Sequence, residues 1–409
     1  MNSIVSVAAC IAVLVAILAV SWWARPTLSP PSRTEALLGF RGLLAIGVVL
    51  HHGLIWYHFT HGLGWTDHTR FRQFGEGRVA LFFMMASMIF FGQLLDAKHR
   101  RFDWLRFFVS RLLRLAPVYW LAMTIMFAIV AFVTLRGIDG AGSSLVQRNW
   151  PDVLGSAAVW LGFSMLGTPA IDAYFNTPMI VAGVTWTMPF ELAFYFVLPL
   201  LALALRVSMS LPVLAIGLCG ALWIFAWAPP ALLLAPFLGG MAAALLIRVP
   251  RLPALLLGRA AACLALAATT CGAFFFWTAY APLCLLLLTF SLSVVAVGNS
   301  LFGLLEMPFV RRLGTMSYSI FLLHGIVLYT LFMLVLGVGR LAVLGPLPFA
   351  LLVAAVLPVV LLVAHASQRW IESPAMRGLP HIVAALRRWR RSPQVDRRPA
   401  SSAPPTADC

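Results

Sequence analysis

A series of apolar runs, each close to 20 residues long, constrains this sequence more than any other feature. The runs fall at residues 4–23, 41–59, 79–96, 115–135, 186–205, 211–228, 231–247, 260–279, 282–300, 315–337 and 345–367. A helix needs about 20 apolar residues to cross the hydrocarbon core of a bilayer. Because 62% of the 409 residues are hydrophobic and 10% are charged, lipid must be the solvent. We therefore predict an all-α polytopic membrane protein, a bundle of about 10–11 transmembrane helices.

A shorter apolar stretch, residues 153–166, has flanks rich in Gly, Pro and Asp. The positive-inside rule decides how it is placed. If it is re-entrant or interfacial and the N-terminus is outside, the segments that together hold most of the basic residues become cytoplasmic, namely 24–40, 97–114, 206–210, 248–259, 301–314 and the tail from 368. If it crossed the membrane, the later basic loops would face the wrong side. We therefore expect a re-entrant or interfacial segment.

The sequence divides into three parts. Residues 1–34 are predicted to form an extra N-terminal transmembrane helix with a linker, and residues 35–375 a membrane-embedded domain. Residues 376–409 are predicted to be a basic, partly disordered cytoplasmic tail. Within this tail, residues 381–391 have the composition of a basic interfacial helix.

The net charge of the chain indicates which kind of partner it could bind. A net charge of +16 in a soluble chain would suggest a nucleic acid partner. Here the arginines cluster between apolar spans, so we expect membrane lipid as the partner and no nucleic acid. The six cysteines show no metal-ligand spacing, and neither a metal nor a bound cofactor is predicted.

Two pairs of charged or titratable residues stand out, because burial of a charge in the membrane is costly. The first joins Arg41 at the cytoplasmic side to His52 near mid-membrane, and the second is Arg111 with Arg114 at the cytoplasmic start of a span. Arg41 and His52 are eleven residues apart, about three helical turns, and therefore share one helix face about 16 Å apart along the axis. Arg111 and Arg114 share a face at spacing i, i+3, and paired guanidinium groups suit phosphates. A snorkelling arginine and an interfacial histidine are the alternative interpretation of the first pair, and ordinary positive-inside arginines are the alternative for the second.

Two further polar residues lie within spans. Glu191 is in a span that Pro189 and Pro199 interrupt, which favours a cavity-lining helix. His324 lies about ten residues into its span, accompanied by Tyr318. A structural ion pair for Glu191 and an interhelical hydrogen bond for His324 are equally compatible with the sequence. Glu372, just past the last span, is expected to pair with a cytoplasmic arginine.

These segments, in this order, resemble the membrane-bound acyltransferase family 3, the bacterial O-acyltransferases of polysaccharides and related acceptors. The family's motifs are matched by Arg41 with His52, by Arg111 with Arg114, loosely by Trp186, Thr187 and Glu191, closely by Ser317, Tyr318, Ser319, Leu322 and His324, and by Glu372 with Pro374. One motif departs, because Ala80 stands in place of an aspartate in the segment RVALFFMMAS.

The resemblance implies a membrane-bound O-acyltransferase of the inner membrane. It would transfer an acyl group, in the main expectation acetyl, from cytoplasmic acyl-CoA to a hydroxyl of an extracytoplasmic acceptor such as a saccharide. His52 and Arg41 would be catalytic, with His52 acting as general base or as acyl carrier. Arg111 and Arg114 would bind the donor. Glu191, Trp186, Tyr318 and His324 would position the acceptor or support His52.

Two functions from other classes are alternatives to the acyltransferase. A transporter or flippase of an envelope glycan or lipid precursor would use the same intramembrane polar groups as a substrate path. Such proteins often contain inverted repeats, and this sequence shows no such symmetry. In a structural subunit of an envelope complex, the intramembrane charges would be needlessly costly.

Overall fold

The computed structural model describes residues 33–65, 72–99, 102–137, 149–172, 174–227 and 229–391. Across these residues the ordered elements are helices, and the only extended pairing is an isolated bridge between Ile171 and Tyr174. The predicted all-α fold is confirmed. The predicted first span at 4–23 and the tail from 392 lie outside the described residues.

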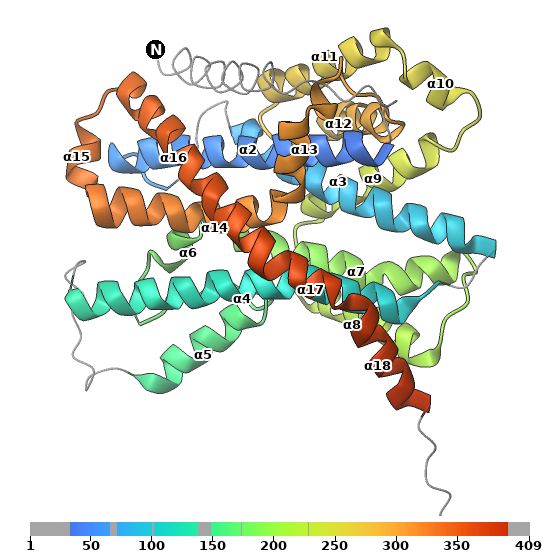
Figure 1. The fold of residues 1–409 in the computed structure, drawn as a ribbon, viewed down its shortest axis with the longest axis horizontal. Helices are drawn as coiled ribbons and strands as arrows, with labels where there is room; N and C mark the ends of the chain where they lie inside the picture. Colours follow the sequence, from blue (N-terminus) through green and yellow to red (C-terminus); the bar gives the residue numbers. More distant parts are fainter. Residues whose placement is uncertain are drawn as a thin grey trace, which may run out of the picture.

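Six helical segments of the described chain are long and apolar enough to cross a membrane. They are α2 (Arg33–Thr60), α3 (Arg72–Asp96), α4 (Trp104–Arg136), Val184–Ala204 with α7 (Thr187–Ala204), Ser317–Leu336 with α14 (Ser317–Tyr329), and Pro346–Trp389 with α16 (Pro346–Ser367). Four apolar helices are shorter, namely α8 (Leu211–Trp227), α9 (Ala231–Leu246), α11 (Arg259–Phe275) and α12 (Pro282–Ala296). These ten correspond to the ten runs predicted after the first. In Figure 1, α2, α3, α4 and α7 lie along the long axis of the molecule.

Short elements connect the long helices. They are η1 (Ala97–His99), α5 (Trp150–Leu161), α6 (Thr177–Ile180), η3 (Val184–Trp186), α10 (Leu252–Leu256), η4 (Leu304–Glu306), α13 (Pro308–Thr315), α15 (Val338–Ala342), α17 (Ser373–Arg377) and α18 (Leu379–Arg391), together with two π-helical segments, η5 (Thr330–Leu336) and η6 (Gln368–Glu372). The predicted basic helix at 381–391 therefore forms as most of α18.

The short apolar stretch at 153–166 forms α5 and the turn that follows it. Twelve helical residues span about 18 Å at the usual rise, whereas the hydrocarbon core is about 30 Å thick. Tyr119 and Trp120 of α4 hold this segment, because they donate hydrogen bonds to the carbonyl oxygens of Trp160 and Leu161. The length of α5 favours the predicted re-entrant or interfacial placement over a crossing.

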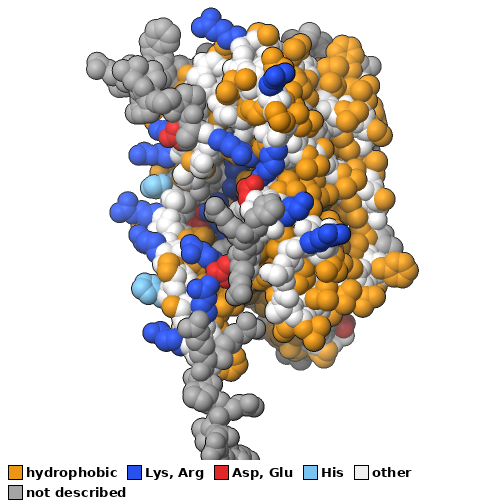
Figure 2. All heavy atoms as spheres, turned by 90° about the vertical axis from the view of Figure 1, so that its right-hand side faces the viewer, with side chains coloured by type: hydrophobic (Ala, Val, Ile, Leu, Met, Phe, Trp, Pro, Cys, Tyr) orange, Lys and Arg blue, Asp and Glu red, His pale blue; other side chains and the backbone are white. Residues whose placement is uncertain are grey.

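Arginines gather at one end of the bundle. Ion pairs join the helix ends there: Arg248 contacts Asp96 at 2.6 Å, Arg311 pairs with Glu35, and Arg387 pairs with Asp103. Figure 2 shows this end, with blue side chains around a hollowed centre and apolar side chains over one flank. We call it the basic end. It brings together the loops predicted to share the cytoplasmic side.

Glycines let α13 approach the backbone of α2. A Cβ added at Gly42 of α2 would lie 2.6 Å from the Val310 carbonyl oxygen of α13, and one added at Gly314 of α13 would lie 1.9 Å from the Leu38 carbonyl oxygen. Such close backbone contact is typical of small residues at helix interfaces in membranes. The contact fixes where α14 begins relative to α2, since α14 follows α13 directly.

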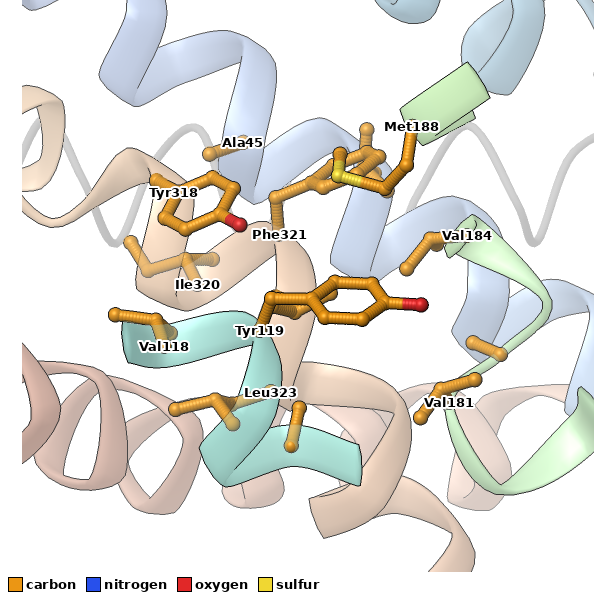
Figure 3. Packing of buried hydrophobic residues seen from close by; sticks show 14 of the residues in the cluster. Ala45, Val118, Tyr119, Val181, Val184, Met188, Tyr318, Ile320, Phe321 and Leu323 are labelled. Carbon is orange, nitrogen blue, oxygen red and sulfur yellow. The ribbon is translucent and has the colours of Figure 1, made fainter. Parts of the chain in front are cut away.

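The main core lies where α2, α4, α7 and α14 meet. Figure 3 shows Tyr318 and Phe321 of α14 close to Ala45 of α2 and to Tyr119 of α4. Large apolar side chains are also exposed on the outside of the bundle, for example Leu211, Phe225 and Leu351. Exposed apolar surface on this scale suits contact with lipid.

Candidate active site

Arg111 and Arg114 lie in the first third of α4, close to the start of that helix, where a cap orders the chain. Asp103 accepts a hydrogen bond from the backbone N–H of Arg106 at 3.1 Å, which satisfies one of the free donors of the first turn. One to two turns later come Arg111 and Arg114. The guanidinium carbon of Arg111 lies 4.6 Å from the centre of the Phe90 ring, a cation–π contact. Arg111 and Arg114 therefore enter the bundle from its basic end.

Arg114 forms a buried ion pair with Glu372, whose side chain is only 3% exposed. Glu372 also accepts a hydrogen bond from Ser319 of α14 at 3.1 Å. It belongs to the π-helical segment η6, and the extra residue per turn of a π-helix re-aims a side chain relative to an α-helix. The sequence predicted an arginine partner for Glu372, and the structure identifies that partner as Arg114.

A cavity of about 300 Å³ opens between α2, α3, α4, α7 and α14. Arginine, acid, hydroxyl and aromatic side chains share its wall. The polar members are Arg41, Gln93, Arg111, Arg114, Thr187, Glu191, Tyr195, Ser317 and Tyr318; the apolar ones are Val79, Phe82, Phe83, Met85, Ala86, Ile89, Phe90, Leu115, Met188 and Phe321. Five of the eight site residues predicted from the sequence therefore line one cavity.

Arg41 reaches this cavity from α2, the helix against which α13 packs. Within the part of the chain that the structure describes, its guanidinium makes no hydrogen bond or ion pair. A guanidinium offers five N–H donors, so an arginine in a cavity without a protein acceptor is suited to an anionic ligand.

The remaining polar wall is held by hydrogen bonds. Tyr195 donates to Glu191 within α7, at spacing i, i+4. The Tyr318 hydroxyl donates to the Leu115 carbonyl oxygen at 2.9 Å and so links α14 to α4. Tyr195 was not predicted from the sequence, although its position one turn after Glu191 was a usable signal.

His52 and His324 meet although 272 residues separate them in the sequence. The His52 Nδ1 atom lies 3.1 Å from His324 Nε2, and their ring centroids are 4.9 Å apart. His324 is fully buried, and His52 lies on α2 three turns from Arg41. The sequence was compatible with an interhelical hydrogen bond of His324 but named no partner. In the structure His324 makes such a hydrogen bond, and its partner is His52.

The surrounding carbonyl groups determine which nitrogen of each neutral ring carries hydrogen. His324 Nδ1 lies 3.0 Å from the Ile320 carbonyl oxygen, which can only accept, so this nitrogen is the donor. His324 Nε2 is then an acceptor, and His52 Nδ1 donates towards it and towards the Val48 carbonyl oxygen at 3.0 Å. In this tautomer the lone pair of neutral His52 is on Nε2, the arrangement that a general base requires, and the backbone of Ala182 is a further hydrogen-bond partner of the ring.

The histidine pair lies deeper than the cavity. Neither histidine lines it, and the nearest lining residue on α14 is Phe321, one helical turn before His324. Trp186 also lies outside the lining, where its ring packs against Phe83 and Phe190 with centroids 6.3 and 5.6 Å apart. The structure thus contains an arginine-lined cavity towards the basic end and a histidine pair further along α2.

The fold and this arrangement define a multi-pass membrane protein with a basic cavity inside its helical bundle. Residues 35–365 match a family model described as an acyltransferase domain, that of acyltransferase family 3. The chain therefore belongs to acyltransferase family 3 and is an acyltransferase of membrane type. Neither the curated proteins nor the solved structures contain a match to this chain.

Proposed function

We propose that this protein transfers an acyl group, specifically acetyl, from cytoplasmic acyl-CoA to a hydroxyl of an extracytoplasmic saccharide. The observation that carries the proposal is the pairing of the arginine-lined cavity with the His52–His324 contact on the same helix, α2. A phosphate-bearing donor suits the first feature, and proton transfer from a hydroxyl suits the second.

The donor enters from the basic end. Arg41, Arg111 and Arg114 hold its phosphate groups, because guanidinium groups form short, charge-assisted hydrogen bonds with phosphate oxygens. The flexible pantetheine arm then extends past Phe321 towards His52. Arg41 and His52 lie about 16 Å apart along α2, a separation that an extended arm has to bridge.

His52 Nε2 takes the proton from the acceptor hydroxyl. The oxygen attacks the thioester carbon, a C–O bond forms, the C–S bond breaks, and the CoA thiolate leaves with the proton. His324 touches neither reactant, and it acts as a positioning residue that fixes the His52 ring through Nδ1. A brief acyl-histidine intermediate at the same nitrogen is the alternative course.

The test is transfer of labelled acetyl from acetyl-CoA to envelope saccharides in membranes that contain the protein. Mass spectrometry should detect one acetyl group per modified sugar, absent from a deletion strain and absent with His52→Ala. His381→Ala, a histidine exposed on α18, is the matched control and should behave as the unaltered protein. Acylation by His52→Ala at normal membrane levels would refute the role of His52. An unchanged set of saccharide masses in the deletion strain would refute the saccharide acceptor.

A further inference from the structure

The hydroxyl of Ser317 is the unusual polar group of the cavity. Ser317 is 1% exposed and lines the cavity, and its Oγ atom has no hydrogen-bond partner within the described chain. A buried polar group without a partner is costly, so native structures rarely keep one without a ligand or a water to satisfy it. By contrast Ser319, two residues further along α14, is bonded to Glu372.

Ser317 is also the first residue of α14, a helix of 13 residues. The N–H groups in the first turn of a helix have no acceptor within the helix, and the helix dipole makes this end positive. Ser317 and Tyr318 both line the cavity, so the N-terminus of α14 is part of its wall. Helix N-termini of this kind bind phosphate groups.

The charges around this N-terminus are mostly positive. Arg41, Arg111 and Arg114 line the same cavity, whereas the acidic groups are Glu372, which pairs with Arg114, and Glu191, which accepts a hydrogen bond from Tyr195. The contact of Gly314 with the backbone of α2 holds the start of α14 close to the helix that bears Arg41. The Ser317 hydroxyl, the N-terminus of α14 and the three arginines therefore belong to the same cavity.

We propose that the N-terminus of α14 and the Ser317 hydroxyl bind the 5′-diphosphate of the acyl-CoA donor. This inference rests on the proposed function and names the part of the donor that the cavity takes. A volume of about 300 Å³ equals the share of roughly ten water molecules in the liquid. It accommodates a diphosphate and the start of the pantetheine arm, and it leaves the adenosine outside, towards the basic end.

The diphosphate is the group that the geometry selects. The thioester has to reach His52, so the pantetheine arm points inwards and the phosphates next to it lie at its entrance. The 3′-phosphate is on the ribose, beyond the diphosphate, and therefore falls outside the cavity.

The experiment is calorimetric binding to the purified full-length protein in nanodiscs of zwitterionic lipid. The probes are acetyl-CoA, its analogue without the 3′-phosphate, and S-acetylpantetheine, which has no phosphate. Ser317→Ala should weaken both phosphate-bearing probes about ten- to hundredfold, the usual effect of losing a hydrogen bond to a charged group. It should leave S-acetylpantetheine unchanged.

The matched control is Ser293→Ala on α12, because Ser293 is equally buried but donates to the Thr289 carbonyl oxygen at 2.8 Å. This variant should bind all three probes normally. Without ligand, Ser317→Ala should melt at the same temperature as the unaltered protein or higher, since it removes an unsatisfied hydroxyl, whereas Ser293→Ala should melt lower.

The same anion chemistry could come from a lipid headgroup, so the binding is repeated in nanodiscs that contain phosphatidylglycerol. Unchanged acetyl-CoA affinity supports the donor assignment, and competition by the anionic lipid overturns it. If Ser317→Ala weakened the binding of all three probes equally, the assignment of a phosphate site would be overturned. If the substitution weakened acetyl-CoA but not the analogue without the 3′-phosphate, the assignment to the 5′-diphosphate would be overturned. If the unaltered protein binds no acetyl-CoA, the proposed function itself fails.

Discussion

Replacement of Glu372 by glutamine should lower the free energy of unfolding by about 3 kcal/mol, because it leaves Arg114 without its counter-charge inside the bundle. Breaking a buried ion pair by removing one partner typically costs about 3–5 kcal/mol. The lower end applies here, since the Arg114 side chain is 22% exposed, Glu372 is 3% exposed, and a glutamine oxygen can still accept from Ser319.

A second ion pair provides a matched comparison. Arg387 of α18 and Asp103 at the start of α4 also connect the C-terminal segment to α4, but their side chains are 51% and 40% exposed. Exposed pairs contribute about 0.2–1 kcal/mol. Arg387→Gln should therefore cost at most about 1 kcal/mol, although it breaks a contact between the same parts of the chain.

Unfolding in mixed micelles, driven by a denaturing detergent and followed by circular dichroism, measures both effects. A double-mutant cycle with Arg114→Gln isolates the coupling, because the double variant removes both charges together. Arg114→Gln with Glu372→Gln should be more stable than Glu372→Gln alone. Equal losses for Glu372→Gln and Arg387→Gln, or a coupling energy near zero in the buried pair, would refute the reasoning.

Two further outcomes follow from the packing and from the histidine pair. Gly314→Ala should destabilise the protein by about 1–3 kcal/mol, since the new Cβ would lie 1.9 Å from the Leu38 carbonyl oxygen. Gly155→Ala on α5, with open space around it, should be neutral or stabilising. The same unfolding titration measures both variants, and equal effects would contradict the close contact. His324→Phe should lower kcat with the acetyl-CoA KM unchanged. His324→Gln should keep more activity, because its amide oxygen can accept a hydrogen bond from His52 Nδ1. Equal losses of activity for the two variants in steady-state kinetics would contradict the positioning role.

The helical spans and the polar residues that are costly to bury within them could be predicted from the sequence. Apolar runs of about 20 residues define helices by a local rule, and the cost of burying charge marks Arg41, His52, Glu191 and His324 wherever they pack. Helical periodicity likewise placed Arg111 and Arg114 on one face, and both line the cavity. These properties depend only on neighbours in the chain, so no tertiary contact is needed to see them.

Which helix faces meet depended on tertiary packing. The sequence left His324 with an unnamed partner and Glu372 with an unnamed arginine; the structure joins His324 to His52 and Glu372 to Arg114. It also leaves Trp186 outside the cavity, although the sequence grouped it with Glu191.

Ser317 shows the limit of sequence reasoning most clearly. A serine in an apolar span normally bonds a carbonyl of its own helix, as Ser293 does, and the two are alike in sequence terms. Among the described residues, the position of Ser317 at the start of α14, against a cavity, leaves its hydroxyl without a hydrogen-bond partner. The membrane bundle and its costly polar residues follow from local hydrophobicity and helical period, so they can be identified without a structure. Which of these residues share a site depends on packing, because close contacts such as Gly314 with α2 join segments hundreds of residues apart.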